Sequence, residues 1–84
     1  MILHTINKPS AWAEASNLIN ENDVLVMLEN GVYLGLKEIN QGYAIRADAE
    51  ARGLLKRLRD GIELIDYGEF VRLCARADKI CAWF

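Results

Sequence analysis

The sequence predicts an α/β fold, a three-layer sandwich around a mostly parallel five-stranded sheet. Short apolar segments alternate with segments of helical periodicity along the whole chain. The run Val24–Leu28 is apolar at every position, which is typical of a central parallel strand covered on both faces. A chain of 84 residues leaves room for one domain, which we assign to residues 1–84.

The strands and helices are predicted in alternating order. The predicted strands are Met1–Ile6, Val24–Leu28, Gly42–Arg46, Ile62–Ile65 and Lys79–Phe84. The predicted helical segments are Ala11 to about Asn20, about Val32–Ile39, a brief turn from Asp48 to Arg52, and a final helix after Asp66. Ser10 and Asp48 are expected to be the N-caps of the first and third of these segments, and Gly53 is expected to end the third.

The final helix carries the strongest local signal. Asp66 and Glu69 have the spacing of a capping box, so Asp66 is predicted to be a helix cap rather than a catalytic acid. Four residues then fall at helical spacing and form a stripe that is expected to be buried: Phe70, Leu73, Cys74 and Ala77.

Composition excludes several classes of protein. Apolar residues make up 52% of a short chain, so we expect a small core and self-association or assembly with other chains. The net charge is −2 and no basic cluster is present, which argues against direct binding of nucleic acid. No apolar run approaches the ~20 residues that span a bilayer, and no signal peptide is recognisable. A cytoplasmic protein with reduced thiols is therefore expected.

The two cysteines are the first candidates for chemistry. A thiol can carry sulfane sulfur as a persulfide if its thiolate is accessible, and Cys81 in the last strand is the candidate acceptor. Lys79 is the only cation beside it in the sequence. A buried structural cysteine is the favoured interpretation of Cys81, and core packing is favoured for Cys74. The C-x6-C spacing fits neither a redox motif nor a metal site.

The remaining candidates are a histidine and a polar turn. His4 is the only histidine and has no partner nearby in the sequence, so we expect a hydrogen-bonded structural residue. One His and two separated Cys predict no metal site, and no cofactor motif is present. The turn Glu29–Gly31 follows a predicted strand and could hold an anion, although a tight-turn role for Gly31 is favoured. Three charged residues should share that sheet edge: Arg46, Asp48 and Asp66.

Several segments together resemble the TusB/DsrH family of sulfur-relay subunits, which has a DsrEFH-like fold. They are Leu3-His4-Thr5, Glu29-Asn30-Gly31-Val32, Tyr43-Ala44-Ile45, Asp48–Leu54, Ile65–Leu73 and Ala82-Trp83. The resemblance implies a subunit of a cytoplasmic heterohexamer that passes persulfide sulfur between carrier proteins. In the Tus branch the sulfur ends in 2-thiouridine at the tRNA wobble position, and in the Dsr branch it serves sulfur oxidation.

The resemblance also implies where the reactive thiol lies. It belongs to a sister subunit of the TusD/DsrE type, whereas some DsrH chains carry a second cysteine in the first helix. The predicted first helix here contains none, and the connection between the second and third strands is short for the family. The implied partners are sister subunits resembling TusC/DsrF and TusD/DsrE, or further copies of this chain, together with sulfur carrier proteins.

Three functions therefore stay open at the level of sequence. The first is an accessory subunit of a sulfur-relay complex that carries no sulfur itself. The second is a stand-alone, homo-oligomeric sulfur carrier that uses Cys81. The third is a small-anion-binding α/β module that uses the Glu29–Gly31 edge.

Overall fold

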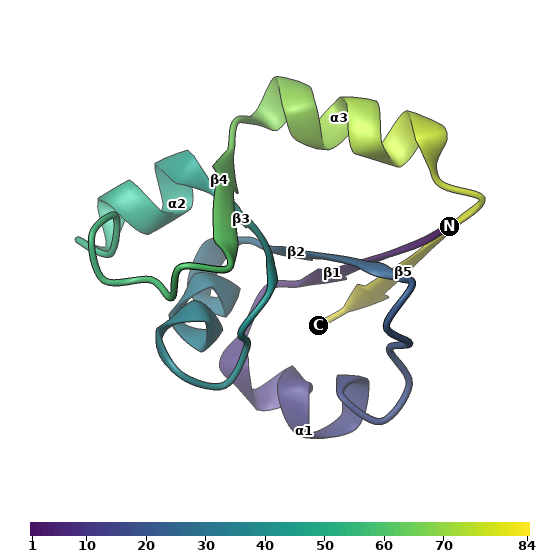
Figure 1. Ribbon diagram of the computed structural model, residues 1–84, viewed down its shortest axis with the longest axis horizontal. Coiled ribbons are helices and arrows are strands. Elements are labelled where there is room, and N and C mark those ends of the chain that lie inside the picture. Colours follow the sequence, from purple (N-terminus) through teal and green to yellow (C-terminus); the bar gives the residue numbers. More distant parts are fainter.

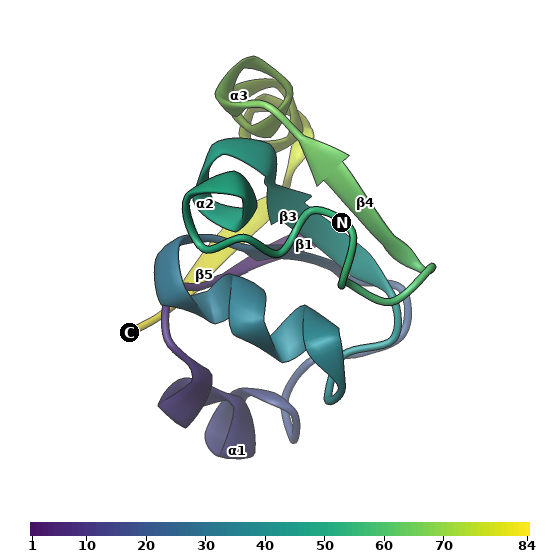
Figure 2. The ribbon, with the colours of Figure 1, turned by 90° about the vertical axis from the view of Figure 1, so that its left-hand side faces the viewer.

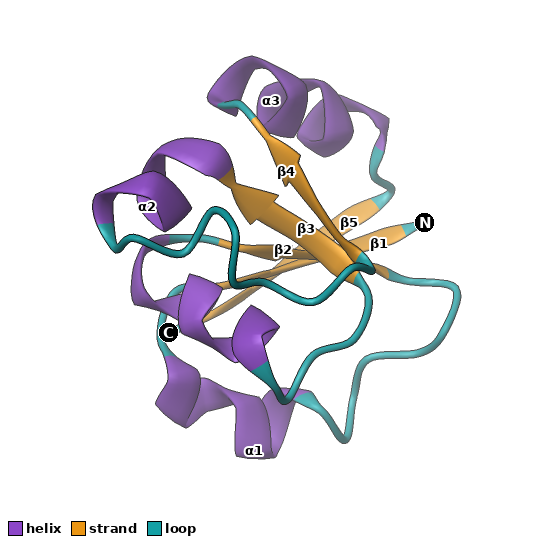
Figure 3. Ribbon diagram, turned by 60° about the vertical axis from the view of Figure 1, so that its left-hand side comes forward, coloured by secondary structure: helices purple, strands orange, loops and turns teal.

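The computed structural model describes residues 1–84 and contains one five-stranded sheet in the order β4-β3-β2-β1-β5. All four strand pairs are parallel, as Figures 1 and 3 show. The strands are β1 (Ile2–Ile6), β2 (Val24–Met27), β3 (Gly42–Ile45), β4 (Ile62–Ile65) and β5 (Lys79–Trp83). The predicted strands are therefore confirmed, with boundaries that shift by one residue at most.

Helical segments cover both faces of the sheet. They are the 3-10 segments η1 (Pro9–Ala11) and η2 (Glu29–Leu36) and the α-helices α1 (Trp12–Ala15), α2 (Arg46–Ala51) and α3 (Tyr67–Arg76). Figures 1 and 2 show α3 alone on one side of the sheet and the other helical segments on or around the opposite side. The predicted three-layer sandwich is thus confirmed, although its two outer layers differ greatly in size.

The order of the strands explains this asymmetry. From β1 to β4 the chain moves stepwise across the sheet in one direction. Right-handed crossovers then place each connection on the same face. From β4 the chain returns across the whole sheet to β5, beside β1. Reversing direction with the same handedness puts the connecting helix α3 on the other face.

Two apolar cores lie on the two sides of the sheet. The larger contains eleven buried residues, among them Ile6, Met27 and Leu54, and is packed under the shorter helical segments. The smaller contains five buried residues, Leu3, Val26, Ile45, Ile65 and Leu73, of which only Leu73 belongs to a helix. Because β2 supplies buried side chains to both cores, the prediction of a central strand covered on both faces is confirmed.

Two predicted helices differ from the structure. Instead of one helix from Ala11 to Asn20, η1 is followed by the four-residue α1, and Ser10 lies inside η1 without capping it. The side chains of Ser16 and Asn17 both donate to the Ala13 carbonyl, which competes with continuation of the helix. The helix predicted over Val32–Ile39 is the eight-residue 3-10 segment η2, which begins earlier at Glu29.

The capping predictions had different outcomes. At α3 the capping box is complete, because the Asp66 carboxylate accepts from the Glu69 N–H at 2.7 Å and the Glu69 side chain accepts from the Asp66 N–H at 3.4 Å. The predicted stripe packs against the smaller core, but only Leu73 is fully buried, while Phe70, Cys74 and Ala77 are half-buried. Asp48 does not cap α2, which begins two residues earlier at Arg46. No helix of the structure has the length and apolar character needed to cross a bilayer.

Candidate functional site

Cys81, the candidate sulfur acceptor, lies in the middle of edge strand β5. It is half-buried and stands opposite His4 of β1 in the parallel register. Residues at opposite positions of neighbouring strands project from the same face of a sheet. The structure therefore brings the only histidine beside this cysteine, although 77 positions separate them in the sequence.

Both ring nitrogens of His4 are already engaged. Nε2 lies 2.8 Å from Asp23 Oδ2, and the indole Nε1–H of Trp83 donates to Nδ1 at 3.1 Å. Trp83 can only donate, so Nδ1 is the acceptor and the proton of the neutral ring is on Nε2. His4 is 3% exposed, and the prediction of a hydrogen-bonded structural histidine is confirmed. A histidine held in this way has no free nitrogen to take a proton from the Cys81 thiol.

The Asp23 carboxylate completes this cluster. It accepts the hydrogen bond from His4 and a second one from the backbone N–H of Asn20 at 3.1 Å. These hydrogen bonds, the one from His4 above all, hold the pKa of Asp23 below its usual range. The cluster joins the turn before β2 to β1 and to the end of β5, which is the pattern of a structural anchor.

Cys74 lies on the other side of the sheet from His4. It is half-buried on the inner stripe of α3 and packs against the smaller core. Since the two thiols project from opposite sides of the sheet, they form no dithiol pair. No group of three or more His, Cys, Asp or Glu side chains is close enough to hold a metal ion.

The carboxyl ends of the strands hold a second polar cluster, centred on Asp48. Its Oδ2 accepts the backbone N–H of Glu29 at 2.8 Å and the phenol O–H of Tyr67 at 3.3 Å. The connection after β3 leads to one face of the sheet and that after β4 to the other, which is the topological position where α/β proteins often bind ligands. Here the hydrogen bond from Tyr67 to Asp48 joins the two connections.

Arg52 extends the same cluster. Its Nε–H donates to Asn30 Oδ1 and its NH1 group to the Asp48 carbonyl, both at 2.9 Å. Tyr67 has a raised pKa, because partial desolvation of this half-exposed ring disfavours the phenolate and the neighbouring Asp48 carboxylate repels it. The phenol is therefore a hydrogen-bond donor and not a base at neutral pH.

The Glu29–Gly31 turn is the part of this edge where the sequence allows an anion site. Glu29 has a φ of 51°, in the left-handed region that is uncommon for a residue with a side chain. A Cβ at Gly31 would lie 2.1 Å from the Ile6 carbonyl oxygen, so this position requires glycine because two backbone segments approach closely there. The Glu29 N–H is bonded to Asp48 and the Gly31 N–H to the Leu28 carbonyl. An anion would have to compete for both of these donors.

Sequence reasoning placed some of these groups correctly and missed how they interact. It placed Arg46, Asp48 and Asp66 at one edge, and each does follow the carboxyl end of its strand. It missed the bonds of Asp48 to Glu29 and Tyr67. The shared edge is predictable, because residues that follow parallel strands meet at one edge of the sheet. The contacts of Asp48 require in addition that β2 and β3 are neighbours, and those of His4 with Asp23 and Trp83 require β1 to lie between β2 and β5.

Comparisons with known proteins agree on the relationship of this chain. Residues 8–80 match the family described as DsrH-like proteins. A protein named TusB from Pectobacterium parmentieri is 33% identical to this chain, over 98% of the chain and 100% of that protein. A protein named TusB from Escherichia coli strain SMS-3-5 is 34% identical with the same coverage. These alignments extend over 95 and 96 residues, so the relatives contain segments that this 84-residue chain lacks.

Two solved structures have the same fold. The ychN protein from E. coli superposes with a TM-score of 0.70 at 16% identity, covering 98% of this chain and 97% of that one. Protein Tm0979 from Thermotoga maritima superposes with a TM-score of 0.69 at 28% identity, covering 89% and 92%. The predicted fold class is thus confirmed by structural relatives as well as by the sheet itself.

Proposed function

The chain belongs to the TusB/DsrH family of sulfur-relay subunits, and from this premise we propose that it is an accessory subunit that carries no sulfur itself. The observation that carries the proposal is the family match over residues 8–80 together with the engagement of His4. A persulfide acceptor needs an accessible thiolate that attacks the outer sulfur of a donor persulfide while the donor leaves as a thiolate. The two nitrogens that could deprotonate Cys81 are bonded elsewhere.

The carboxyl edge supports the same conclusion. At the position between β3 and β4 where α/β proteins often place a reactive group, Asp48 and Tyr67 are hydrogen-bonded to each other, and Arg52 is bonded to Asn30 beside them. Neither cysteine follows the carboxyl end of a strand, since Cys81 is inside β5 and Cys74 is inside α3. In this proposal the chain provides contact surfaces for the other subunits of the assembly. The sulfur is carried by a sister subunit resembling TusD/DsrE.

The process that the complex serves is part of the proposal. The relatives of comparable length carry the name TusB, which favours the branch that delivers sulfur for 2-thiouridine in tRNA over the branch that serves sulfur oxidation. The partners are then subunits resembling TusC/DsrF and TusD/DsrE, with sulfur carrier proteins before and after them. A cytoplasmic location follows from the same assignment.

The proposal is tested by following the sulfur atom. The chain, alone and in complex with the sister subunits of its source, is incubated with a persulfide donor and each subunit is weighed by intact-mass spectrometry. We expect an added sulfur atom on the TusD-like subunit and none on this chain. A complex containing Cys81→Ser is expected to transfer sulfur at the wild-type rate, and Cys74→Ser provides the matched control for loss of a thiol.

One observation favours a stand-alone carrier as the second candidate. Cys81 is in an edge strand and only half-buried, so a donor can approach it from the open side of β5. An added sulfur atom mapped to Cys81, together with loss of transfer in Cys81→Ser but not in Cys74→Ser, would replace the accessory function with this one.

A further inference from the structure

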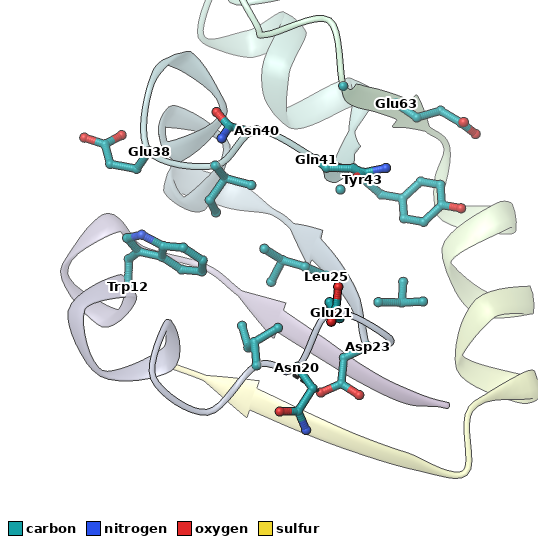
Figure 4. A pocket seen from close by; sticks show the side chains of 15 residues that line it. Trp12, Asn20, Glu21, Asp23, Leu25, Glu38, Asn40, Gln41, Tyr43 and Glu63 are labelled. Atoms are coloured by element: carbon teal, nitrogen blue, oxygen red, sulfur yellow. Dashed lines mark hydrogen bonds between the residues drawn. The ribbon is translucent and has the colours of Figure 1, made fainter.

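An open groove of about 640 Å³ lies at the amino ends of β2, β3 and β4, at the opposite sheet edge from Asp48. One wall is formed by α1 and the turn before β2, and the other by the connection from η2 to β3 (Figure 4). Its apolar floor includes the buried side chains of Leu25 and Ile39. The half-buried side chains of Trp12 and Ile19 also belong to it. The groove thus offers an apolar surface that the chain itself leaves open.

The rim of this groove is acidic. Glu21, Glu38 and Glu63 come from three separate segments and are all exposed. Figure 4 shows their side chains spaced around the opening, with Trp12 and Leu25 between them. None of the three takes part in an ion pair of the chain, and no Lys or Arg lines the groove.

The fourth acidic residue of the lining has a different role. Asp23 is bonded to His4 and to the Asn20 N–H, so its Oδ2 oxygen already has hydrogen-bond partners within this chain. The remaining three carboxylates have no cationic partner in this chain. A positive group at the rim would gain from the carboxylate nearest to it.

We propose that this groove is the docking site for a basic side chain, Arg or Lys, that a partner protein presents on its surface. The aliphatic stem of such a side chain lies on the apolar floor, its cationic head meets the rim carboxylates, and the Trp12 ring contributes a cation–π contact. The proposal rests on the assembly put forward above, because assembly supplies the partner. It adds which face of this chain is used and what chemistry recognises it.

The form of the groove favours a protein segment over a free cation. The groove is open and its rim is exposed, so salt screens the attraction of a small free cation over a Debye length of about 8 Å at physiological ionic strength. Residues that flank a basic side chain on a protein surface can cover the apolar floor as well, which excludes water around the ion pairs.

The first test uses a peptide as the probe. The ¹⁵N-labelled chain is titrated with acetyl-Leu-Arg-Leu-amide and, separately, with the same peptide containing uncharged citrulline in place of Arg. We expect the arginine peptide to shift the backbone amide signals of Leu25, Ile39 and Gly42, and the citrulline peptide to leave them unchanged. Equal shifts with both peptides, or shifts confined to other parts of the chain, would overturn the proposal.

Charge-reversal variants locate the binding. Glu38→Lys combined with Glu63→Lys is expected to weaken peptide binding about tenfold or more. Glu14→Lys combined with Glu50→Lys makes the same change of net charge at exposed residues outside the groove, and it should change binding less than about threefold. Equal weakening by both pairs would show a general charge effect and contradict a docking site. Spermidine that binds as tightly as the arginine peptide would show a site for free cations instead.

The sister subunits provide the last test. The double variant Glu38→Lys with Glu63→Lys should co-purify less with TusC-like and TusD-like subunits. The control variant Glu14→Lys with Glu50→Lys should co-purify as the unmodified chain does. If the unmodified chain does not assemble with these subunits, the accessory function fails, while the peptide titration still decides whether the groove binds a basic side chain. If the unmodified chain assembles and the variant Glu38→Lys with Glu63→Lys assembles equally well, the groove proposal alone fails.

Discussion

At the scale of single residues, the cluster of Asp23, His4 and Trp83 ties the most distant parts of the chain together. Its two side-chain hydrogen bonds join residues that are 19 and 79 positions apart. The geometry allows the neutral ring to satisfy both partners at once, whereas a protonated ring would direct a second N–H at the Trp83 donor. Buried polar groups are costly unless they are paired, so this cluster specifies how the edge strand β5 seats on β1.

The lowered pKa of Asp23 gives this cluster a defined dependence on pH. A carboxyl group with a lower pKa in the folded state stabilises the fold above its unfolded pKa, and this contribution is lost as the pH falls through the folded pKa. The loss therefore begins below about pH 4. We expect Asp23→Asn to lower the Tm at pH 7 and to flatten the decline of Tm in acid, as measured by thermal unfolding from neutral to acidic pH. Asp60→Asn, at an exposed position, is the control and should leave the profile parallel to wild type. Parallel profiles for Asp23→Asn as well would show that the carboxylate is not linked to folding.

At the scale of secondary structure, the strands could be predicted and the helices on the larger face could not. Strands such as Val24–Met27 are recognisable because full burial on two faces leaves a continuous apolar run. The end of α1 at Ala15 depends on side-chain bonds to the Ala13 carbonyl, which no apolar period reveals. In η2, Gly31 must approach the Ile6 backbone closely, and glycine in place of a better helix former weakens an α-helix by about 1 kcal/mol.

The candidate sites divide in the same way. The capping role of Asp66 and the inner position of Cys74 follow from spacing along one helix, so the sequence alone was sufficient. The bonds of Asp48 depend on which strands are neighbours, and strand order cannot be obtained from one sequence. The acidic groove was also missed, because its rim residues come from three segments that only the folded sheet brings together.

Among the local features of the helices, loss of the capping box of α3 should have the clearest effect on the free energy of unfolding. Helix α3 is the only helix on its face, and the Asp66 carboxylate accepts from the Glu69 N–H at 2.7 Å. Asp66→Ala leaves that donor without its cap and should lower the free energy of unfolding by about 0.5–2 kcal/mol in urea titrations. Asp66→Asn retains the acceptor oxygen and should cost only a small part of this. If both variants lose the same stability, the charge of Asp66 and not the hydrogen bond is what matters.

At the scale of the whole molecule, the path of the chain leaves one face thinly covered. The three successive crossovers from β1 to β4 place their helical segments on one side of the sheet. The other side is covered by α3 alone. Large apolar side chains remain exposed on α3 and at β5, including Val71, Ile80 and Phe84, which are 63%, 50% and 75% exposed. A chain of this length buries only ~60–65% of its unfolded surface, so covering such residues by another subunit has a large relative effect on stability.

We therefore expect the isolated chain to self-associate and to form a mixed complex when sister subunits are supplied, as measured by light scattering and analytical ultracentrifugation at micromolar concentration. Ile80→Glu places a charge on the thinly covered side of β5 and should shift the isolated chain toward the monomer, because a carboxylate buried at an interface without a partner is costly. Leu18→Glu is the matched control, since Leu18 is 61% exposed but follows α1 on the opposite side of the sheet. A monomeric wild-type chain that also ignores its sister subunits would contradict the prediction. Equal effects of both substitutions would place the contact elsewhere than on the side of β5.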